Sequence, residues 1–464
     1  MEDPVSSEVR ATQRPATFRE VFASREFGAL YLASAISWFG DYLARAAVTG
    51  LVYEKTSSVA LSAATFALSY APWIVGGPFL AALAERLPFR RVMVFCDVLR
   101  MLLISAVALP FLPIPALLGL LFLTALLNPP AQAARSALIP VLLTGDRLVV
   151  GLALNITTGQ IAQFTGYAVG SLLVPVNPRL ALIVDGFTFL ISAVLLRVGL
   201  REHPSLLPAE EERHLLRDTV DGFRVVFGTR ILRAIAILVF SSMLVAAVPD
   251  GLAAAWAAEV SSDGARGVSQ SVIMAAHHVG YVLAGLIIGR LVRPAMRRSL
   301  IRPFAVLAPL ALVPAVLNPP VAGIALMSAC CGFATAGMLP AANGLFVQVL
   351  PAAYRARAFG VMQSGVQIMQ GVGVMATGLL ADRLSLPMVV GLWSLAGVAL
   401  ILAASLNWPS ASSIEHAITT NAQLNEAAAA PAQPVPAAGH AVTGAIPSAA
   451  AGEAARPATG GVSL

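Results

Sequence analysis

The chain has 464 residues, of which 58% are hydrophobic and only 12% are charged, and its formal net charge is +6. Soluble domains carry about 25% charged residues, so this composition excludes a soluble globular protein and predicts an all-α polytopic membrane protein. The basic balance does not indicate nucleic-acid binding, because the arginines stand in short turns between apolar runs, where they orient a membrane protein. The three cysteines all fall inside apolar runs and form neither a disulfide framework nor a metal-ligand pattern.

Twelve apolar runs follow a polar segment at residues 1–26, and each is long enough to cross a bilayer as a helix. Proline interrupts the fourth run at Pro129-Pro130 and the tenth at Pro340, so both helices are expected to be broken there. The predicted spans are 27–52, 59–83, 92–112, 115–137, 148–174, 179–198, 231–250, 268–291, 300–317, 320–345, 357–380 and 386–406.

The spans divide into two halves of six, 27–198 and 231–406, as in transporters built from parallel repeats. The linker at 199–230 ends in an amphipathic stretch that predicts a helix on the membrane surface. Residues 407–464 are rich in alanine and proline, which predicts a disordered tail. The apolar positions of the linker are Leu216, Val220, Phe223 and Phe227, followed by Ile231.

Loop charge predicts the orientation, because cytoplasmic loops carry an excess of arginine and lysine. With the N-terminus inside, the outer loops contain only Lys55, Arg179, Arg266 and Arg383. We therefore expect a multi-pass protein of the cell (inner or plasma) membrane, with both termini in the cytoplasm. The inner loops carry Arg86, Arg90, Arg91, Arg135, Arg147, Arg201, Arg213, Arg217, Arg224, Arg293, Arg297, Arg298, Arg355 and Arg357.

A charged turn joins spans two and three, and its sequence resembles the signature loop of the major facilitator superfamily, G-x-x-x-D-R-x-G-R-R. Glu85 stands at the aspartate position, Arg86 matches, and Arg90 and Arg91 continue the basic run. Pro88 replaces the second glycine of the pattern. The resemblance covers roughly residues 25–405 and implies two six-helix bundles that rock about a central site.

Within span three, Asp97 and Arg100 resemble the D-x-x-R that follows this loop in the drug-exporter branch, which includes enterobactin and macrolide exporters. Acids and bases clustered at a helix end can form a charge network that holds one conformation and breaks in the other. We expect such a gating network here. Its predicted members are Glu85, Arg86, Arg90, Arg91, Asp97 and Arg100; a simple topology signal is the alternative for the loop arginines.

Span five contains Gly166-Tyr167 and Gly170-Ser171, which resemble the antiporter motif of the same superfamily. Small residues at this spacing let a facing helix approach closely. Gly166 and Gly170 are therefore expected to hold the two halves together on one side, with ordinary packing inside a bundle as the alternative.

Placing a charged side chain in the middle of a membrane span costs about 2.5–3.5 kcal/mol of insertion free energy. Such side chains therefore usually face a water-filled cavity or a partner of opposite charge. Asp41 and Arg45 lie one helical turn apart in span one. Either Asp41 gains and loses a proton during transport while Arg45 tunes it, or the two form a permanent structural ion pair. Asp185 in span six is a second candidate for proton coupling, with helix capping or packing as its alternative.

Uncharged polar residues in two spans predict a wet central cavity. Gln363, Gln367 and Gln370 fall at i, i+4 and i+7, on one face of span eleven. The alternative for these groups is hydrogen bonding between helices. The other predicted members of the cavity wall are Asn155, Gln160 and Gln163 in span five and His277 in span eight.

These observations predict a secondary active transporter that exports an amphipathic small molecule in exchange for protons. Its expected partners are the bilayer, the substrate and protons, and we expect it to be a monomer without cofactor or nucleic acid. No P-loop, nucleophile–base pair or metal triad indicates an enzyme. An uptake permease or lipid transporter of the same superfamily is the main alternative, and a polytopic membrane enzyme is a remote one.

Overall fold

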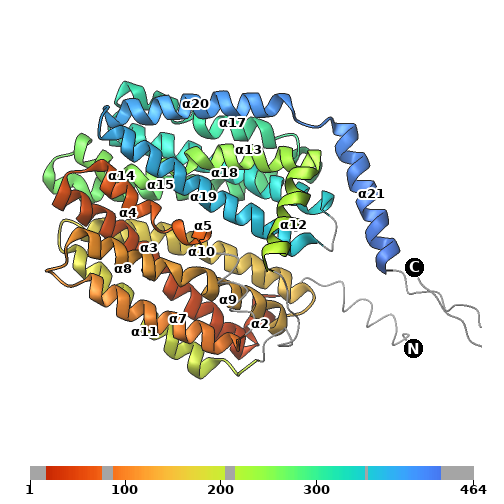
Figure 1. Ribbon diagram of the computed structural model, residues 1–464, viewed down its shortest axis with the longest axis horizontal. Coiled ribbons are helices and arrows are strands. Elements are labelled where there is room, and N and C mark those ends of the chain that lie inside the picture. Colours follow the sequence, from red (N-terminus) through yellow and green to blue (C-terminus); the bar gives the residue numbers. More distant parts are fainter. Residues whose placement is uncertain (1–16, 76–86, 204–214, 351–353, 430–464) are drawn as a thin grey trace, which may run out of the picture.

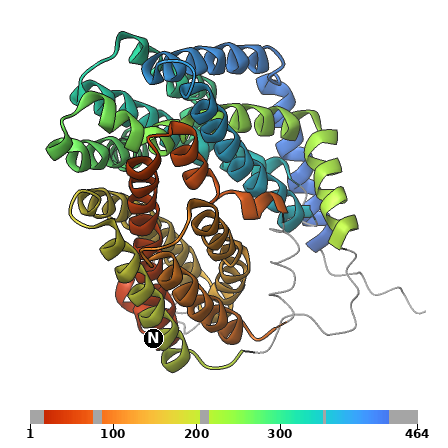
Figure 2. The ribbon, with the colours of Figure 1, turned by 60° about the vertical axis from the view of Figure 1, so that its left-hand side comes forward.

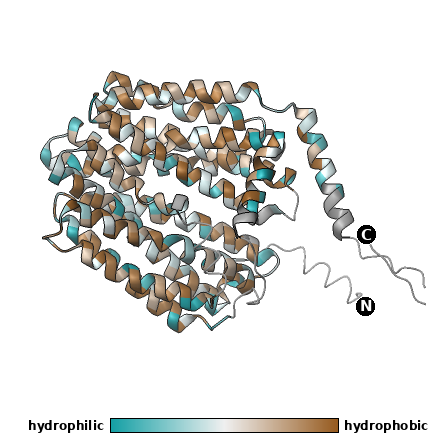
Figure 3. Cartoon of the chain, in the orientation of Figure 1, coloured by the Kyte–Doolittle hydropathy of each residue, from teal (hydrophilic) through white to brown (hydrophobic). Residues whose placement is uncertain are grey.

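The computed structural model describes residues 17–75, 87–203, 215–350 and 354–429, and in these ranges its regular structure is entirely helical. Two bundles lie one above the other in Figure 1, and apolar residues dominate the helices of both bundles in Figure 3. Eight helices in the described ranges are long and apolar enough to cross a membrane. The all-α polytopic fold expected from the sequence is confirmed.

The first bundle begins with α3, whose ends are set by serines. The Ser24 hydroxyl accepts a hydrogen bond from the Phe27 N–H at the start, and Ser57 adopts a left-handed backbone (φ 50°) just after the end. The helices of this bundle are α2 Phe18–Phe22, α3 Arg25–Thr56, α4 Val59–Ala67, α5 Ala71–Val75, α7 Phe89–Val107, α8 Ile114–Leu126, α9 Asn128–Leu142, α10 Asp146–Leu173 and α11 Pro178–Gly199.

The second bundle repeats the six-span plan, so that each predicted span has a helical counterpart in the described residues. Residues 76–83 of the predicted second span lie outside those residues. The elements of this bundle are α13 Arg230–Ala246, α14 Val248–Val260, η1 Asp263–Ala265, α15 Arg266–Leu291, α16 Pro294–Arg297, α17 Ile301–Leu310, η2 Val313–Leu317, α18 Val321–Val349, α19 Arg355–Ala381 and α20 Leu386–Leu406.

Two predicted boundaries are wrong. The seventh span does not end at residue 250, because α14 follows α13 after the single residue Ala247 and residues 251–257 are all buried. Pro340 does not interrupt the tenth span, since α18 runs through it without a break. In the fourth span the helix does divide, at Leu127, just before Pro129 and Pro130.

The linker between the bundles forms helix α12, Leu215–Gly228, as its apolar spacing predicts. It packs against α13 and α19 at the right-hand end of the molecule in Figure 1. Val226 is fully buried, whereas Val220 and Phe223 are about half exposed.

The segment after α20 contains a helix, α21 Ala411–Ala429, where the sequence predicts disorder. Ile414, Ala417 and Ile418 fall on one face and pack against the core of the second bundle. The Asn421 side chain donates to the backbone carbonyls of Gln348 and Leu350, at 2.8 and 3.1 Å. The disorder prediction is therefore wrong for this part of the tail; residues 430–464 lie outside the described ones.

The two bundles touch mainly at the end where α3 terminates, at the left in Figure 1, and Figure 2 gives a second view of this junction. Helix α10 packs against α15 there, and α4 packs against α19. The Gln270 amide donates to the Ala46 carbonyl at 3.0 Å, and the Ser271 hydroxyl donates to the Ala168 carbonyl at 3.1 Å. We call this junction the seal.

Candidate functional site

A cavity of about 930 Å³ lies between the two bundles. Its wall on α10 comes from the first part of that helix, residues 155–163, whereas the seal contact at Ala168 lies further along. Helix α19 follows the same pattern, with wall residues at 359–370 and Val374 packed against α14. The cavity is therefore closed at the seal and extends toward the end of the molecule where α3 begins.

Polar side chains from both bundles line this cavity. The three glutamines of α19 all lie on the cavity wall, as their i, i+4, i+7 spacing on one helix face predicts. Trp38, Tyr70 and Trp73 add aromatic surface. The structure places the following predicted residues on the wall: Asn155, Gln160, Gln163, His277, Gln363, Gln367 and Gln370.

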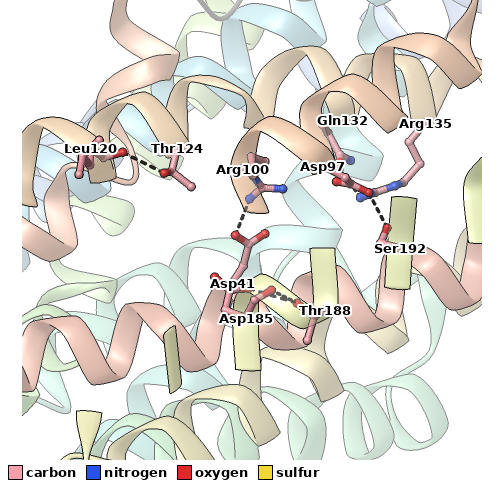
Figure 4. A network of polar contacts seen from close by, with 10 residues as sticks. All are labelled: Asp41, Asp97, Arg100, Leu120, Thr124, Gln132, Arg135, Asp185, Thr188 and Ser192. Carbon is pink, nitrogen blue, oxygen red and sulfur yellow. Dashed lines mark hydrogen bonds and ion pairs between the residues drawn. The ribbon is translucent and has the colours of Figure 1, made fainter. Parts of the chain in front are cut away.

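Asp41 forms an ion pair with Arg100 of the facing helix α7, as Figure 4 shows. The Arg100 side chain is almost completely buried and lies 4.2 Å from the centre of the Phe189 ring. Among the described residues the Asp41 carboxylate forms its ion pair with Arg100 and not with Arg45, so the structural Asp41–Arg45 ion pair is not present. Both members of the Asp41–Arg100 pair line the cavity.

Arg45 points instead into a group of aromatic rings. Its guanidinium carbon lies 5.2 to 5.9 Å from the ring centres of Tyr42, Phe66 and Tyr70. Its Nη1 donates to the Tyr167 hydroxyl at 3.3 Å. Cations are attracted to the faces of such rings, which explains why the side chain turns away from Asp41.

Asp185 is buried behind the wall, beside Asp41 in Figure 4. Its carboxylate accepts a hydrogen bond from the Thr188 hydroxyl at 3.2 Å. A Cβ atom at Gly40 would meet Asp185 Oδ1 at only 2.3 Å, so this glycine is what allows α11 to pack so closely against α3. Asp185 does not contact the cavity itself among the described residues, although it lies next to a carboxylate that does.

The predicted gating residues fall into two separate groups. Arg90 and Arg91, at the start of α7, form ion pairs with Glu202, and Arg90 also donates to the Leu200 carbonyl at 3.1 Å. Arg100 lies about 15 Å further along the same helix, at 1.5 Å per residue. Among the described members no ion pair or hydrogen bond joins these two groups; Glu85 and Arg86 lie outside the described residues.

Asp97 belongs to the buried group. Its carboxylate accepts from the Ser192 hydroxyl at 2.6 Å, and Figure 4 shows Arg135 reaching toward it. Arg135 was expected to be a cytoplasmic loop charge, and this expectation is wrong. Arg135 lies in α9, is 5% exposed and stacks on Trp38 at 4.8 Å.

The glycine motif of α10 packs inside one bundle. A Cβ at Gly170 would lie 2.3 Å from the Leu43 carbonyl oxygen, and one at Gly166 would lie 2.8 Å from the Phe39 carbonyl oxygen. Both partners belong to α3 of the same half, so the expectation that these glycines join the two halves is wrong. The neighbouring Ala168 and Ser171, on another face of α10, contact α15 instead.

Asp250 is a wall residue that the sequence pattern does not indicate, because it stands at the predicted end of span seven. It lies 3.7 Å from His278, and its Oδ1 has no hydrogen-bond partner among the described residues. The ring of His278 contacts Tyr167 across the seal, with centroids 5.4 Å apart. The Pro249-Asp250 pair after an apolar run could have indicated a second helical segment, since proline is favoured in a first turn.

Comparisons with known proteins agree with this fold. The model of the Major Facilitator Superfamily matches residues 30–254. A peptide transporter POT in complex with sulfate has a TM-score of 0.66 at 16% identity, covering 90% of this chain and 99% of the other. The nucleoside transporter NupG has a TM-score of 0.65 at 13% identity, covering 83% and 100%.

A third similar structure is a bacterial homologue of the human lysosomal transporter Spinster, inward-facing and occupied, with a TM-score of 0.62 at 14% identity, covering 91% of this chain and 99% of the other. No curated protein matches the chain significantly. The family match covers residues 30–254, and the solved structures share the fold over 83% or more of this chain. Together with the eight long apolar helices, these comparisons support the fold of a multi-pass membrane protein.

Proposed function

We propose that this protein exports an amphipathic small molecule across the cell (inner or plasma) membrane in exchange for protons. The observation that carries the proposal is the central cavity, closed at the seal, with an ion pair between Asp41 and Arg100 in its wall. Transporters of this plan work by rocking two bundles around a fixed midplane site.

The resting state in this proposal is open to the cytoplasm. The arginine-rich loops favour the end where α3 begins as the inner one, and the cavity extends toward that end. An exporter in this state takes its substrate from the cytoplasm or the inner leaflet. Export then requires the seal to open while the helices around the cavity close on the inner side.

The wall is suited to an amphipathic molecule. Aromatic surface from Trp38, Tyr70 and Trp73 can cover an apolar body, and the glutamine side chains can hydrogen-bond to its polar groups. The motif that resembles those of drug exporters, Asp97 with Arg100, supports the same substrate class.

Protons enter the proposal through Asp41. When Asp41 is ionised it holds Arg100, and when it takes up a proton the pair loses its attraction. If the carboxylate releases its arginine when it is protonated, protonation can shift the equilibrium between the inward-open and outward-open states. Arg100, rather than Arg45, is the residue that senses this change.

The test uses inverted and right-side-out membrane vesicles that contain the full-length protein, with a fluorescent amphipathic dye as substrate. An exporter in exchange for protons should accumulate dye in inverted vesicles with an acidic interior. A gradient of one pH unit should support about tenfold accumulation for each proton exchanged, because tenfold corresponds to 1.4 kcal/mol. Accumulation only in right-side-out vesicles would instead identify an uptake permease, and accumulation that ignores the pH gradient would refute proton exchange.

A further inference from the structure

The three arginines on the cavity wall differ in how they are paired with carboxylates. Three of the wall residues are arginines and two are carboxylates. Asp41 and Arg100 neutralise each other, and Asp97 lies beside Arg135 just behind the wall. The charged wall residues are Arg45, Arg100, Arg135, Asp41 and Asp250.

Arg45 has no carboxylate within 4 Å in the described part of the chain. Arg135 forms no such ion pair there either, but it lies beside Asp97 and is only 5% exposed. Asp250 is the remaining wall carboxylate; it lies 3.7 Å from His278, and among the described residues it forms no ion pair with Arg45 within 4 Å. An arginine presents five N–H donors, and the described residues supply one hydrogen-bond acceptor, the Tyr167 hydroxyl. Arg45 is only partly buried, so its other donors are accessible from the cavity.

The rings around Arg45 fix the guanidinium without neutralising it. Tyr42, Phe66 and Tyr70 restrict its position through their faces, but a ring quadrupole leaves the positive charge in place. A charge in a membrane-embedded cavity is costly unless a counter-ion compensates it. A fixed arginine with several unused donors favours a planar oxyanion, because its fork matches a carboxylate bidentately.

We propose that Arg45 binds a carboxylate on the transported molecule, so that the substrate is an amphipathic carboxylate. This inference rests on the proposed function for its transport step, but the binding site itself does not depend on export or on protons. The aromatic rings beside Arg45 and on the wall would contact the apolar part of the same molecule. The glutamine stripe on α19 can donate to further oxygens.

The test is equilibrium dialysis of radiolabelled probes against the full-length protein in lipid nanodiscs at neutral pH. The probes are naphthalene carboxylate and naphthalene carboxamide, which share their shape and differ in charge. The wild-type protein should bind the carboxylate at least about tenfold more tightly, as expected for hydrogen bonds to a charged group. Equal affinities, or no saturable binding of the carboxylate, would overturn the proposal without the use of any variant.

Arg45→Gln should bring the affinity for the carboxylate down to that for the carboxamide and leave the carboxamide unchanged. Arg383→Gln, an exposed arginine far from the cavity wall, is the matched control and should change neither affinity. Loss of both probes to the same extent in Arg45→Gln would contradict a charge-specific role. The dialysis experiment measures binding and not transport. Failure of the export proposal would therefore leave the binding result intact, and failure of carboxylate binding would leave the export proposal intact.

Discussion

Replacing Asp41 with Asn is expected to abolish the coupling between protons and substrate while the protein stays folded in the membrane. Asparagine keeps the shape and one acceptor oxygen, but it can neither ionise nor change its charge with pH. The variant should move substrate down its own gradient and should give no accumulation with a pH gradient, compared with about tenfold for each proton exchanged in the wild type. Dye accumulation in inverted vesicles measures this directly.

The control is Asp263→Asn, which removes an exposed carboxylate whose ion-pair partner in the described ranges is Arg266. It should leave accumulation unchanged. If Asp41 and Arg100 form a permanent structural pair instead, Asp41→Asn would lower the amount of folded protein, because removing one partner of a buried pair costs about 3–5 kcal/mol. Full coupling in the surviving Asp41→Asn protein would contradict the role given to Asp41.

Cross-linking the seal is expected to stop transport. Ser58 and Asp382 belong to different bundles, and their side-chain oxygens lie 3.4 Å apart at an exposed position. The double variant Ser58→Cys with Asp382→Cys should form a disulfide under oxidation, since the two side chains already contact each other between the bundles. Transport should fall to the background of empty vesicles and return when a reducing agent is added.

This experiment needs a background in which the native cysteines, Cys96, Cys330 and Cys331, are replaced. Each single-cysteine variant serves as a control and should transport with or without oxidant. Transport that continues at the wild-type rate in the fully cross-linked protein would mean that the seal does not open during the cycle.

Hydropathy and helical spacing predicted most of the fold. The twelve apolar runs contain helices in the described residues, and the amphipathic linker forms α12. Both features depend on hydropathy and on the helical spacing of apolar residues, which can be seen within a short stretch of sequence. The C-terminal helix α21 is different. Its apolar positions, Ile414 and Ile418, are too few to stand out in an alanine-rich segment, and their partners lie in the distant second bundle.

The site was harder to predict, because spacing gives the face of a helix but not its neighbour. The glutamines of α19 could be assigned to one face from their spacing alone. The partner of Asp41 could not, since Arg100 is 59 residues away and Arg45 only four. Asp250 was missed because a single helix boundary was placed ten residues too early.

The central claim is that the two bundles rock about the cavity, and distances between spin labels test it most directly. One pair of labels replaces Arg147 and Arg290, exposed residues at the inner ends of α10 and α15. The other pair replaces Val176 and Asp263, exposed residues just beyond the opposite ends of the same helices, which are the outer ends in the proposed orientation. Double electron–electron resonance in nanodiscs should show the inner distance shortening and the outer distance lengthening together when the pH is changed from alkaline to acidic. Two distances that stay fixed, or that change in the same direction, would contradict the account.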